Sequence, residues 1–337
     1  MGLDAKVSSV QHVDMNPRLT PDRNLSLEAV RGTEAAAIAA ALHMGSGDDR
    51  AADEAAVAAM RHALNTFSID GTVRIGEGTN FDTNGLSIGE KVGTGKGVKA
   101  DVALVALEGK SIVARGGYNA LSVLATAEDG GFLTVPDIYM DKIAVSREVP
   151  ADAVDLDNDP ADNLKAVADA KGVDVTDLLV VMLDRPRHSQ LLAKVRDTGA
   201  RVRLILDGDV SGAIASGMPN NTVDIYMGIG GAQQGVLASA AIRCFGARMQ
   251  GRLVIRNNDD ADKAKAAGIK DPDTKYAAED MARGNVTFAA TGVSEGPMLD
   301  GVDLSPGSAI THSMVMRSHT GTFRIIEGHH KFNKCDG

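Results

Sequence analysis

The chain has 337 residues and a formal net charge of −10, without the basic footprint that nucleic acids and anionic membranes require, so we expect neither as a partner. Hydrophobic residues make up 44% of the sequence but aromatic residues only 3%, which indicates one large unit or two fused lobes with aliphatic cores. The sequence has no apolar run long enough for a membrane span, no signal-peptide core and no disulfide framework, so we expect a cytoplasmic protein.

The first 150 residues predict a leader, two helices and then strands. Residues 1–24 are polar and contain two prolines, which is typical of a flexible leader. Two alanine-rich segments, 26–44 and 48–66, have the apolar spacing of helices, and Asp48 is placed to cap the second. Short apolar and β-branched runs then predict strands, at residues 72–76 and 102–107. We assign residues 25–150 to an N-terminal lobe.

After about residue 150, strand and helix patterns alternate. Continuous apolar runs predict buried strands at residues 178–183, 201–206 and 223–227, and helices follow at about 187–198 and 232–245. Strands joined by crossover helices form parallel sheets covered on both faces. We therefore expect an α/β protein whose C-terminal lobe, 151–330, holds a mainly parallel sheet. An exposed charged excursion is predicted at 256–275, short strands at 286–328, and a tail at 331–337.

Three polar clusters fall at predicted carboxyl ends of strands, where open α/β sheets bind their ligands. They are Arg185-Pro186-Arg187-His188, Asp207-Gly208-Asp209 and Gly228-Ile229-Gly230-Gly231. Guanidinium forks bind phosphate through two bonds, and a glycine-rich turn that opens a helix presents free amides to an anion. Carboxylates accept bonds from sugar hydroxyls. The clusters together predict a pocket for a phosphorylated polyol, although each alone also fits a solvated arginine pair, a turn or a helix cap.

Seven stretches in a fixed order resemble the class II fructose-1,6-bisphosphatases of the lithium-sensitive phosphatase superfamily. They are Ile69–Gly78, Ile88–Gly97, Pro136–Lys142, Arg185–His188, Asp207–Val210, Gly228–Ala232 and Phe288–Val293. The resemblance extends from about residue 25 to 330. It implies a layered α/β sugar-phosphatase fold with a mixed sheet in the N-terminal lobe. It also implies a homodimer or homotetramer that acts in gluconeogenesis or sugar-phosphate metabolism.

The resemblance further implies Mn²⁺ or Mg²⁺, held by carboxylates, which polarises the 1-phosphate and activates water. The matching ligands present in this chain are Asp53, Glu77 and Glu108. The implied ligand is fructose-1,6-bisphosphate or sedoheptulose-1,7-bisphosphate. The positions implied to contact it are Glu108, Gly109, Lys110, Tyr139, Arg185, Pro186, Arg187, Asp207, Gly208, Asp209 and Gly231.

Several residues depart from the family pattern at positions that the resemblance assigns to metal binding and catalysis. Val105 stands at the position of the metal-bridging Asp, Ala106 follows in place of a Pro, and Lys110 replaces the Thr that aligns the attacking water. Gln234 stands at the position of another metal-binding Glu, and Asp49 at that of a Lys. A divalent ion needs dense negative oxygen ligation, which this set lacks. No catalytic group is therefore intact.

We expect a protein that binds a sugar bisphosphate and hydrolyses its 1-phosphate weakly or not at all. The ammonium of Lys110 is expected to lie among Asp53, Glu77 and Glu108, because it would relieve their mutual repulsion. The alternative is a non-catalytic regulatory or binding paralogue, which senses sugar phosphate or forms mixed oligomers with an active relative. A purely structural scaffold would bind no ligand at all.

Overall fold

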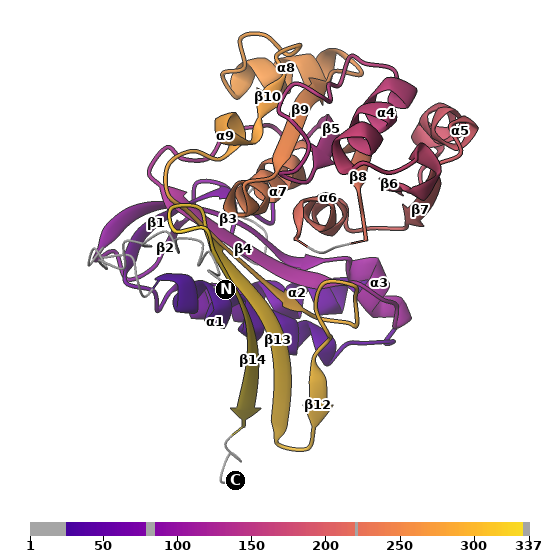
Figure 1. Ribbon diagram of the computed structural model, residues 1–337. Helices are drawn as coiled ribbons and strands as arrows, with labels where there is room; N and C mark the ends of the chain where they lie inside the picture. Colours follow the sequence, from indigo (N-terminus) through magenta and orange to yellow (C-terminus); the bar gives the residue numbers. More distant parts are fainter. Residues whose placement is uncertain (1–24, 79–84, 220–221, 333–337) are drawn as a thin grey trace, which may run out of the picture.

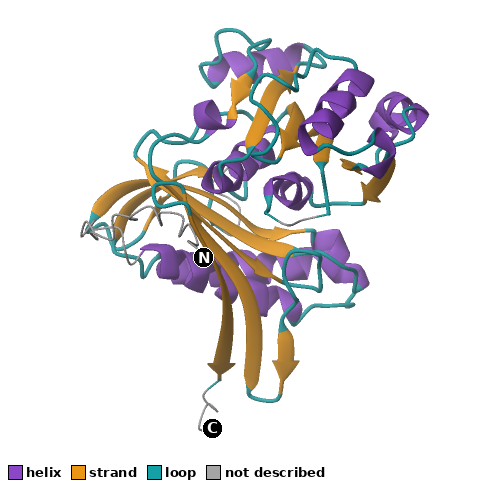
Figure 2. Ribbon diagram, in the orientation of Figure 1, coloured by secondary structure: helices purple, strands orange, loops and turns teal. Residues whose placement is uncertain are grey.

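The computed structural model describes residues 25–78, 85–219 and 222–332. The predicted leader at 1–24 lies outside the described residues, as do residues 333–337 of the predicted tail. In the described part of the chain, no helix is both long and apolar enough to cross a bilayer. Two sheets alternate with three sets of helices, as Figures 1 and 2 show.

The two predicted N-terminal helices are present. They are α1 (Leu25–Ala41) and α2 (Asp49–Leu64). The Asp48 side chain accepts a hydrogen bond from the Ala51 amide at 2.9 Å, which confirms its role as the N-cap of α2.

The first sheet is mixed, as expected for the N-terminal lobe. Its strands are β1 (Ile69–Ile75), β2 (Lys91–Val92), β3 (Val98–Glu108), β4 (Leu121–Glu128), β11 (Val286–Gly292), β12 (Asp303–Ser305), β13 (Ser308–Arg317) and β14 (Thr322–Lys331). They run in the order β12-β13-β11-β4-β3-β1-β2, with β14 on the other edge of β13. The pairing of β1 with β3 is parallel, and β3 pairs antiparallel with β4.

The second sheet is also mixed, which corrects the expectation of a mainly parallel sheet. Its strands are β5 (Tyr139–Val145), β6 (Leu179–Leu183), β7 (Arg201–Ile205), β8 (Ile225–Gly231), β9 (Arg248–Val254) and β10 (Tyr276–Ala277). β6 pairs in parallel with β7 and β8, whereas β5 pairs antiparallel with β8 and β9, and β9 with β10. Parallel pairing within this sheet is confined to β6, β7 and β8. The polar residues of β5 hide that strand from a search for apolar runs.

The remaining helices cover the faces of both sheets. They are α3 (Lys110–Arg115), α4 (Pro160–Lys171), α5 (Ser189–Asp197), α6 (Asp209–Gly217), α7 (Ala232–Phe245), α8 (Asn258–Ala266) and α9 (Ala278–Met281), with 3-10 turns at Val175–Asp177 and Pro186–His188. Alternate residues of each strand face opposite layers. On β4, Leu124 packs in the core with α1 and α2, whereas Val123 packs in the core with α6 and α7. On β8, Tyr226 joins this second core and Ile225 faces α4 and α5.

Each sheet contains strands from both sides of residue 150, the position at which the sequence predicts a boundary between two lobes. β5 precedes that residue yet belongs to the second sheet, and β11 to β14 follow it yet belong to the first. In Figure 1 the yellow C-terminal strands lie beside the purple N-terminal ones. The division into lobes stays a prediction, but the strands themselves tie both ends of the chain to one sheet.

Candidate functional site

A cleft of about 420 Å³ lies between the two sheets, where the ends of β3, β6 and β8 meet the first turns of α3, α6 and α7. Most of the positions singled out in the sequence line it. They are Asp53, Glu77, Glu108, Gly109, Lys110, Tyr139, Arg185, Arg187, Asp207, Asp209 and Gly231. Pro186 and Gly208 are not in the lining; they shape the turns that carry their neighbours. The position follows the rule that ligands bind beyond the carboxyl ends of strands.

Lys110 opens α3 at one end of the cleft. Gly109 turns β3 into that helix with a φ of 90°, a left-handed conformation that favours glycine. The Lys110 ammonium nitrogen lies 3.5 Å from Asp53 Oδ2, in agreement with the expected contact between these two side chains. Burial raises the pKa of the Asp53 carboxyl, and the attraction of Lys110 opposes this rise.

Glu77, just after β1, is held by backbone rather than by a cation. Its Oε1 accepts a hydrogen bond from the Ala106 amide at 2.5 Å. Burial raises the pKa of Glu77 to about 7, against the effect of that bond. Burial thus favours the uncharged form of this carboxyl more than at an exposed glutamate.

Glu108 ends β3 and is buried, with 6% of its surface exposed. Its Oε1 accepts a hydrogen bond from the Val210 amide at 2.9 Å, and its Oε2 has no hydrogen-bond partner among the described residues. Burial, and then the negative charge of Asp209, raise the pKa of Glu108 well above its usual range. A raised pKa favours the protonated carboxyl, the form whose free oxygen can donate a bond to a ligand.

Lys142 reaches from β5 to the start of α6 and is one of the most buried side chains of the protein, 1% exposed. Its ammonium donates to Asp209 Oδ2 and, at 3.0 Å, to the Gly231 carbonyl. A Cβ on Gly230 would lie 1.9 Å from Asp209 Oδ2, so only glycine leaves room for this ion pair. The pair fixes the Asp209 carboxylate at the edge of the cleft. Sequence reasoning had not assigned Lys142 to the site, although it ends one of the family-like stretches.

The two arginines after β6 are held differently. Arg187 donates from Nε and Nη2 to the Ile229 carbonyl at 2.9 and 2.7 Å, and its guanidinium lies 4.7 Å from the centroid of the Tyr139 ring. Arg185 is half-buried and donates to the Asp184 carbonyl at 2.9 Å. Two hydrogen bonds to the Ile229 carbonyl therefore hold the exposed Arg187 against Tyr139, whereas Arg185 bonds to the backbone of its own neighbour.

His188 supports the turn that carries both arginines. Its Nδ1 lies 2.7 Å from the Leu183 carbonyl, and its Nε2 accepts a bond from the Ile229 amide at 2.8 Å. These partners require a neutral ring with the proton on Nδ1. Burial lowers the pKa of His188, which favours the same neutral form. His188 orients the turn and does not present a base to the cleft.

The carboxyl groups do not fit a divalent ion. Asp53 is paired with Lys110. The Glu77 carboxyl accepts from the Ala106 amide, and the Glu108 carboxyl accepts from the Val210 amide of α6. Val105 lines the cleft without a ligand atom. Within residues 25–78, 85–219 and 222–332, no three His, Cys, Asp or Glu side chains gather as they would around a metal. No chemical step is therefore derived through a metal.

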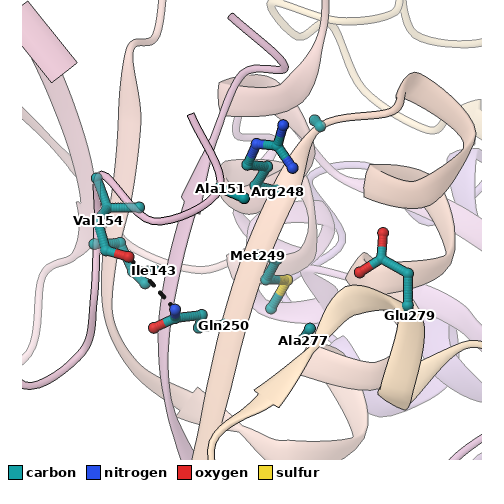
Figure 3. Close-up of a pocket in the computed structure, with 9 residues that line it drawn as sticks. Ile143, Ala151, Val154, Arg248, Met249, Gln250, Ala277 and Glu279 are labelled. Atoms are coloured by element: carbon teal, nitrogen blue, oxygen red, sulfur yellow. Dashed lines mark hydrogen bonds between the residues drawn. The ribbon is translucent and has the colours of Figure 1, made fainter. Parts of the chain in front are cut away.

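A second, smaller cavity lies against β5 and β9 and does not offer a comparable site. It has a volume of about 110 Å³ and one cation, Arg248, with Glu279 on its other side (Figure 3). Two residues that line this cavity are joined by a hydrogen bond, which the Gln250 side-chain amide donates to the Val154 carbonyl at 3.4 Å. Arg248 donates from Nε to the Val149 carbonyl. The cavity lacks the converging cations of the larger cleft, so we assign the ligand site to the latter.

Sequence reasoning also missed Asp137, Leu107 and Leu183, which line the cleft. Asp137 lies two residues before Tyr139 in a family-like stretch, and that proximity is the signal that could have identified it. The two leucines resemble ordinary strand residues, so no local signal distinguishes them. The assembled cleft brings together cations, carboxyl groups of raised pKa and the lysine-paired carboxylate of Asp209, which suits an anion that also carries hydroxyl groups.

Comparison with known proteins supports the resemblance seen in the motifs. The chain matches the family model for bacterial fructose-1,6-bisphosphatase, glpX-encoded, over residues 23–330. It is 39% identical over 334 residues to the D-fructose 1,6-bisphosphatase class 2/sedoheptulose 1,7-bisphosphatase of Synechococcus sp. (strain JA-2-3B'a(2-13)), across 92% of this chain and 96% of that protein. A protein of the same name from Trichodesmium erythraeum (strain IMS101) is 38% identical over 338 residues, across 93% and 98%.

Proposed function

This chain belongs to the family of bacterial, glpX-encoded fructose-1,6-bisphosphatases, and we propose that it binds a sugar bisphosphate in the cleft but hydrolyses the 1-phosphate weakly or not at all. The candidate ligands are fructose-1,6-bisphosphate and sedoheptulose-1,7-bisphosphate, after the names of the relatives. One observation carries the proposal. The ammonium of Lys110 lies 3.5 Å from Asp53 Oδ2, beside a carboxylate that the resemblance assigns to a metal.

Ligand binding is supported by the groups that face the cleft. Arg187 is anchored with its guanidinium over Tyr139, and Asp209 is held by the buried Lys142. Contacts within the protein hold both side chains in place, so little further ordering is required when a sugar phosphate binds. Cations suit the phosphate groups, and the carboxylate suits sugar hydroxyls.

Weak hydrolysis is supported by what surrounds the expected reaction centre. Attack on a phosphate ester needs an activated water, and in this family a metal supplies much of that activation. Val105 offers no ligand atom, and burial raises the pKa of Glu108 well above its usual range. His188 is occupied on both ring nitrogens. The cleft therefore offers groups that can bind a phosphorylated sugar, but few groups that could activate a water molecule.

A regulatory or binding paralogue is the second candidate function, because the binding groups are present where the chemistry is weakened. Such a protein would sense sugar phosphate or form mixed oligomers with an active relative. A homodimer or homotetramer is proposed from the resemblance. Light scattering during size-exclusion chromatography, with and without fructose-1,6-bisphosphate, would measure the assembly.

The deciding experiment compares the natural chain with a Val105→Asp/Lys110→Thr/Gln234→Glu variant. Calorimetry would measure binding of fructose-1,6-bisphosphate, and phosphate release would be followed with Mn²⁺ or Mg²⁺. We expect both proteins to bind the sugar, and only the triple variant to release phosphate at an appreciable rate.

The matched control is Val105→Asp/Gln234→Glu, which restores two carboxylates but keeps Lys110. We expect it to stay inactive, since the ammonium still occupies the position beside Asp53. Rapid turnover by the natural chain would refute weak hydrolysis. Failure of the natural chain to bind either bisphosphate would refute the proposed function as a whole.

A further inference from the structure

A side-chain hydrogen bond joins the two walls of the cleft. Asn119 lies between α3 and β4, in the segment that connects β3 and β4 of the first sheet, and its Nδ2 donates to Ser211 Oγ at 3.0 Å. Ser211 is 2% exposed and lies in the first turn of α6, the helix that follows β7 of the second sheet and begins at Asp209. A neighbouring bond, from Ser111 Oγ to Asp207 Oδ2, is longer, at 3.5 Å.

Ser211 connects Asn119 to the turn that presents Asp207 and Asp209 to the cleft. The Ser211 hydroxyl donates its one proton to the Gly208 carbonyl at 2.7 Å, so it accepts the bond from the Asn119 amide nitrogen. Gly208 has a φ of 84°, a left-handed conformation that favours glycine, and a Cβ there would lie 2.9 Å from Ser211 Oγ. The turn is thus held against Ser211 and, through it, against Asn119.

Asn119 has two unfavourable features. Its φ of 74° lies in the left-handed region, which asparagine adopts more readily than most residues other than glycine. Its Oδ1 is buried and has no hydrogen-bond partner among the described residues. The Asn119 backbone amide donates to the Glu295 carbonyl at 2.7 Å, which anchors this conformation to the segment after β11. Strained backbone and unpaired polar atoms persist where the surrounding structure holds them, often at functional sites.

We propose that Asn119 is a positioning residue for the sugar bisphosphate, which acts through Ser211 to hold the turn of Asp207 and Asp209 at a fixed distance from Lys110. The inference rests on the proposed function. A ligand that contacts Lys110 on α3 and Asp209 on α6 at the same time binds best when the protein already holds the two at the right spacing. Asn119 itself does not line the cleft, and no local pattern connects it with the site.

The test is a double-mutant cycle in the full chain, with calorimetry of fructose-1,6-bisphosphate binding. Asn119→Gly removes the side chain and tolerates the left-handed backbone, and Ser211→Ala removes the acceptor inside a helix. We expect each variant to lose roughly 3- to 10-fold in affinity, which corresponds to one hydrogen bond. The double variant should lose no more than either single variant, because both remove the same bond.

The matched control is Ser216→Ala in the same helix. Ser216 is 1% exposed, and its Oγ donates to the Ala213 carbonyl at 2.7 Å, the same kind of bond that Ser211 makes to Gly208. In the described part of the chain this hydroxyl bonds only within α6, so we expect an unchanged affinity.

A conservative variant separates the bridge from a general effect on the fold. Ser211→Thr keeps the hydroxyl and should recover most of the affinity that Ser211→Ala loses. Thermal unfolding would establish that each variant is folded, and Ser211→Cys, read in the same way, would replace an alanine variant that is not.

The outcomes separate the inference from the proposed function. Additive losses in the double variant, or a loss in Ser216→Ala equal to that in Ser211→Ala, would mean that these residues support only the fold, and would overturn the inference. Unchanged affinity in Asn119→Gly would overturn it as well. If the natural chain did not bind fructose-1,6-bisphosphate, the proposed function would fail first, and the inference with it.

Discussion

The ammonium nitrogen of Lys110 lies 3.5 Å from a carboxylate oxygen of Asp53, at the point where β3 turns into α3. The lysine side chain is about half exposed, so this contact is screened by solvent and contributes little to stability. Its importance is local. It gives the cleft a fixed positive charge close to Glu77, whose pKa Lys110 lowers slightly against the larger effect of burial.

Replacement of Lys110 by methionine should weaken binding of fructose-1,6-bisphosphate by roughly tenfold, because a phosphate group loses a charged partner and meets an unpaired Asp53. Calorimetry at constant ionic strength would measure this change. Lys91→Met is the control, since Lys91 pairs with Asp70 at 3.4 Å, is similarly exposed and lies outside the cleft lining. An unchanged affinity in Lys110→Met would mean that this lysine merely faces solvent.

Replacement of Lys142 by methionine should destabilise the fold by about 3–5 kcal/mol, because Asp209 is left buried without its partner. Denaturant unfolding would measure the loss. In Lys142→Met/Asp209→Leu both charges are removed, and most of the stability should return. Lys194→Met is the exposed comparison: its pair with Asp159 is at the surface, so a loss as large as that of Lys142→Met would argue against burial as the cause.

The neutral His188 should make stability depend on pH on the acidic side of neutrality. Because burial lowers the pKa of this ring, the unfolded chain binds a proton below about pH 6.5, while the folded protein does not. The free energy of unfolding should therefore decrease as the pH falls below about 6.5, and this contribution should be absent above that value.

Denaturant unfolding at a series of pH values would compare the natural chain with His188→Gln. The variant is expected to be less stable overall but to lack this part of the slope. A direct check is the titration of the His188 ring by NMR. A His188 midpoint at or above about 6.5, the value of an unperturbed histidine, would contradict the assignment of a buried, neutral ring.

Gly230→Ala should weaken sugar-bisphosphate binding by more than tenfold, because a Cβ would lie 1.9 Å from Asp209 Oδ2 and 2.8 Å from Lys142 Nζ. Either the ion pair or β8 must move, at a cost of about 1–3 kcal/mol in stability. Calorimetry and unfolding would measure both effects. In the control, Gly32→Ala in α1, the new methyl group would meet only side-chain atoms at 3.3 Å. Binding by this control should be unchanged. Equal losses of affinity in both variants would mean that the effect of Gly230→Ala does not arise from a clash with Asp209.

Much of the fold follows from local patterns. The alanine-rich segments form α1 and α2, Asp48 caps α2, and continuous apolar runs form β3, β6 and β8. The rule for strand ends brings Arg187, Asp207 and Asp209 to one cleft. These predictions succeed because burial and backbone propensity act over a few neighbouring residues. The spacing of apolar residues along the sequence therefore indicates each helix and strand.

The tertiary structure decided what depends on strands that are distant in the sequence. The antiparallel half of the second sheet exists because β5 pairs with β8 and β9, and this pairing brings Lys142 to Asp209 and Arg256 to Tyr139. Each of these contacts joins a residue that the sequence assigned to the site, Asp209 or Tyr139, to one that it did not assign. The residue types that suit a sugar phosphate could thus be recognised in the sequence. Their distances, their burial and the raised pKa of Glu108 arise only when the two sheets enclose them and exclude water.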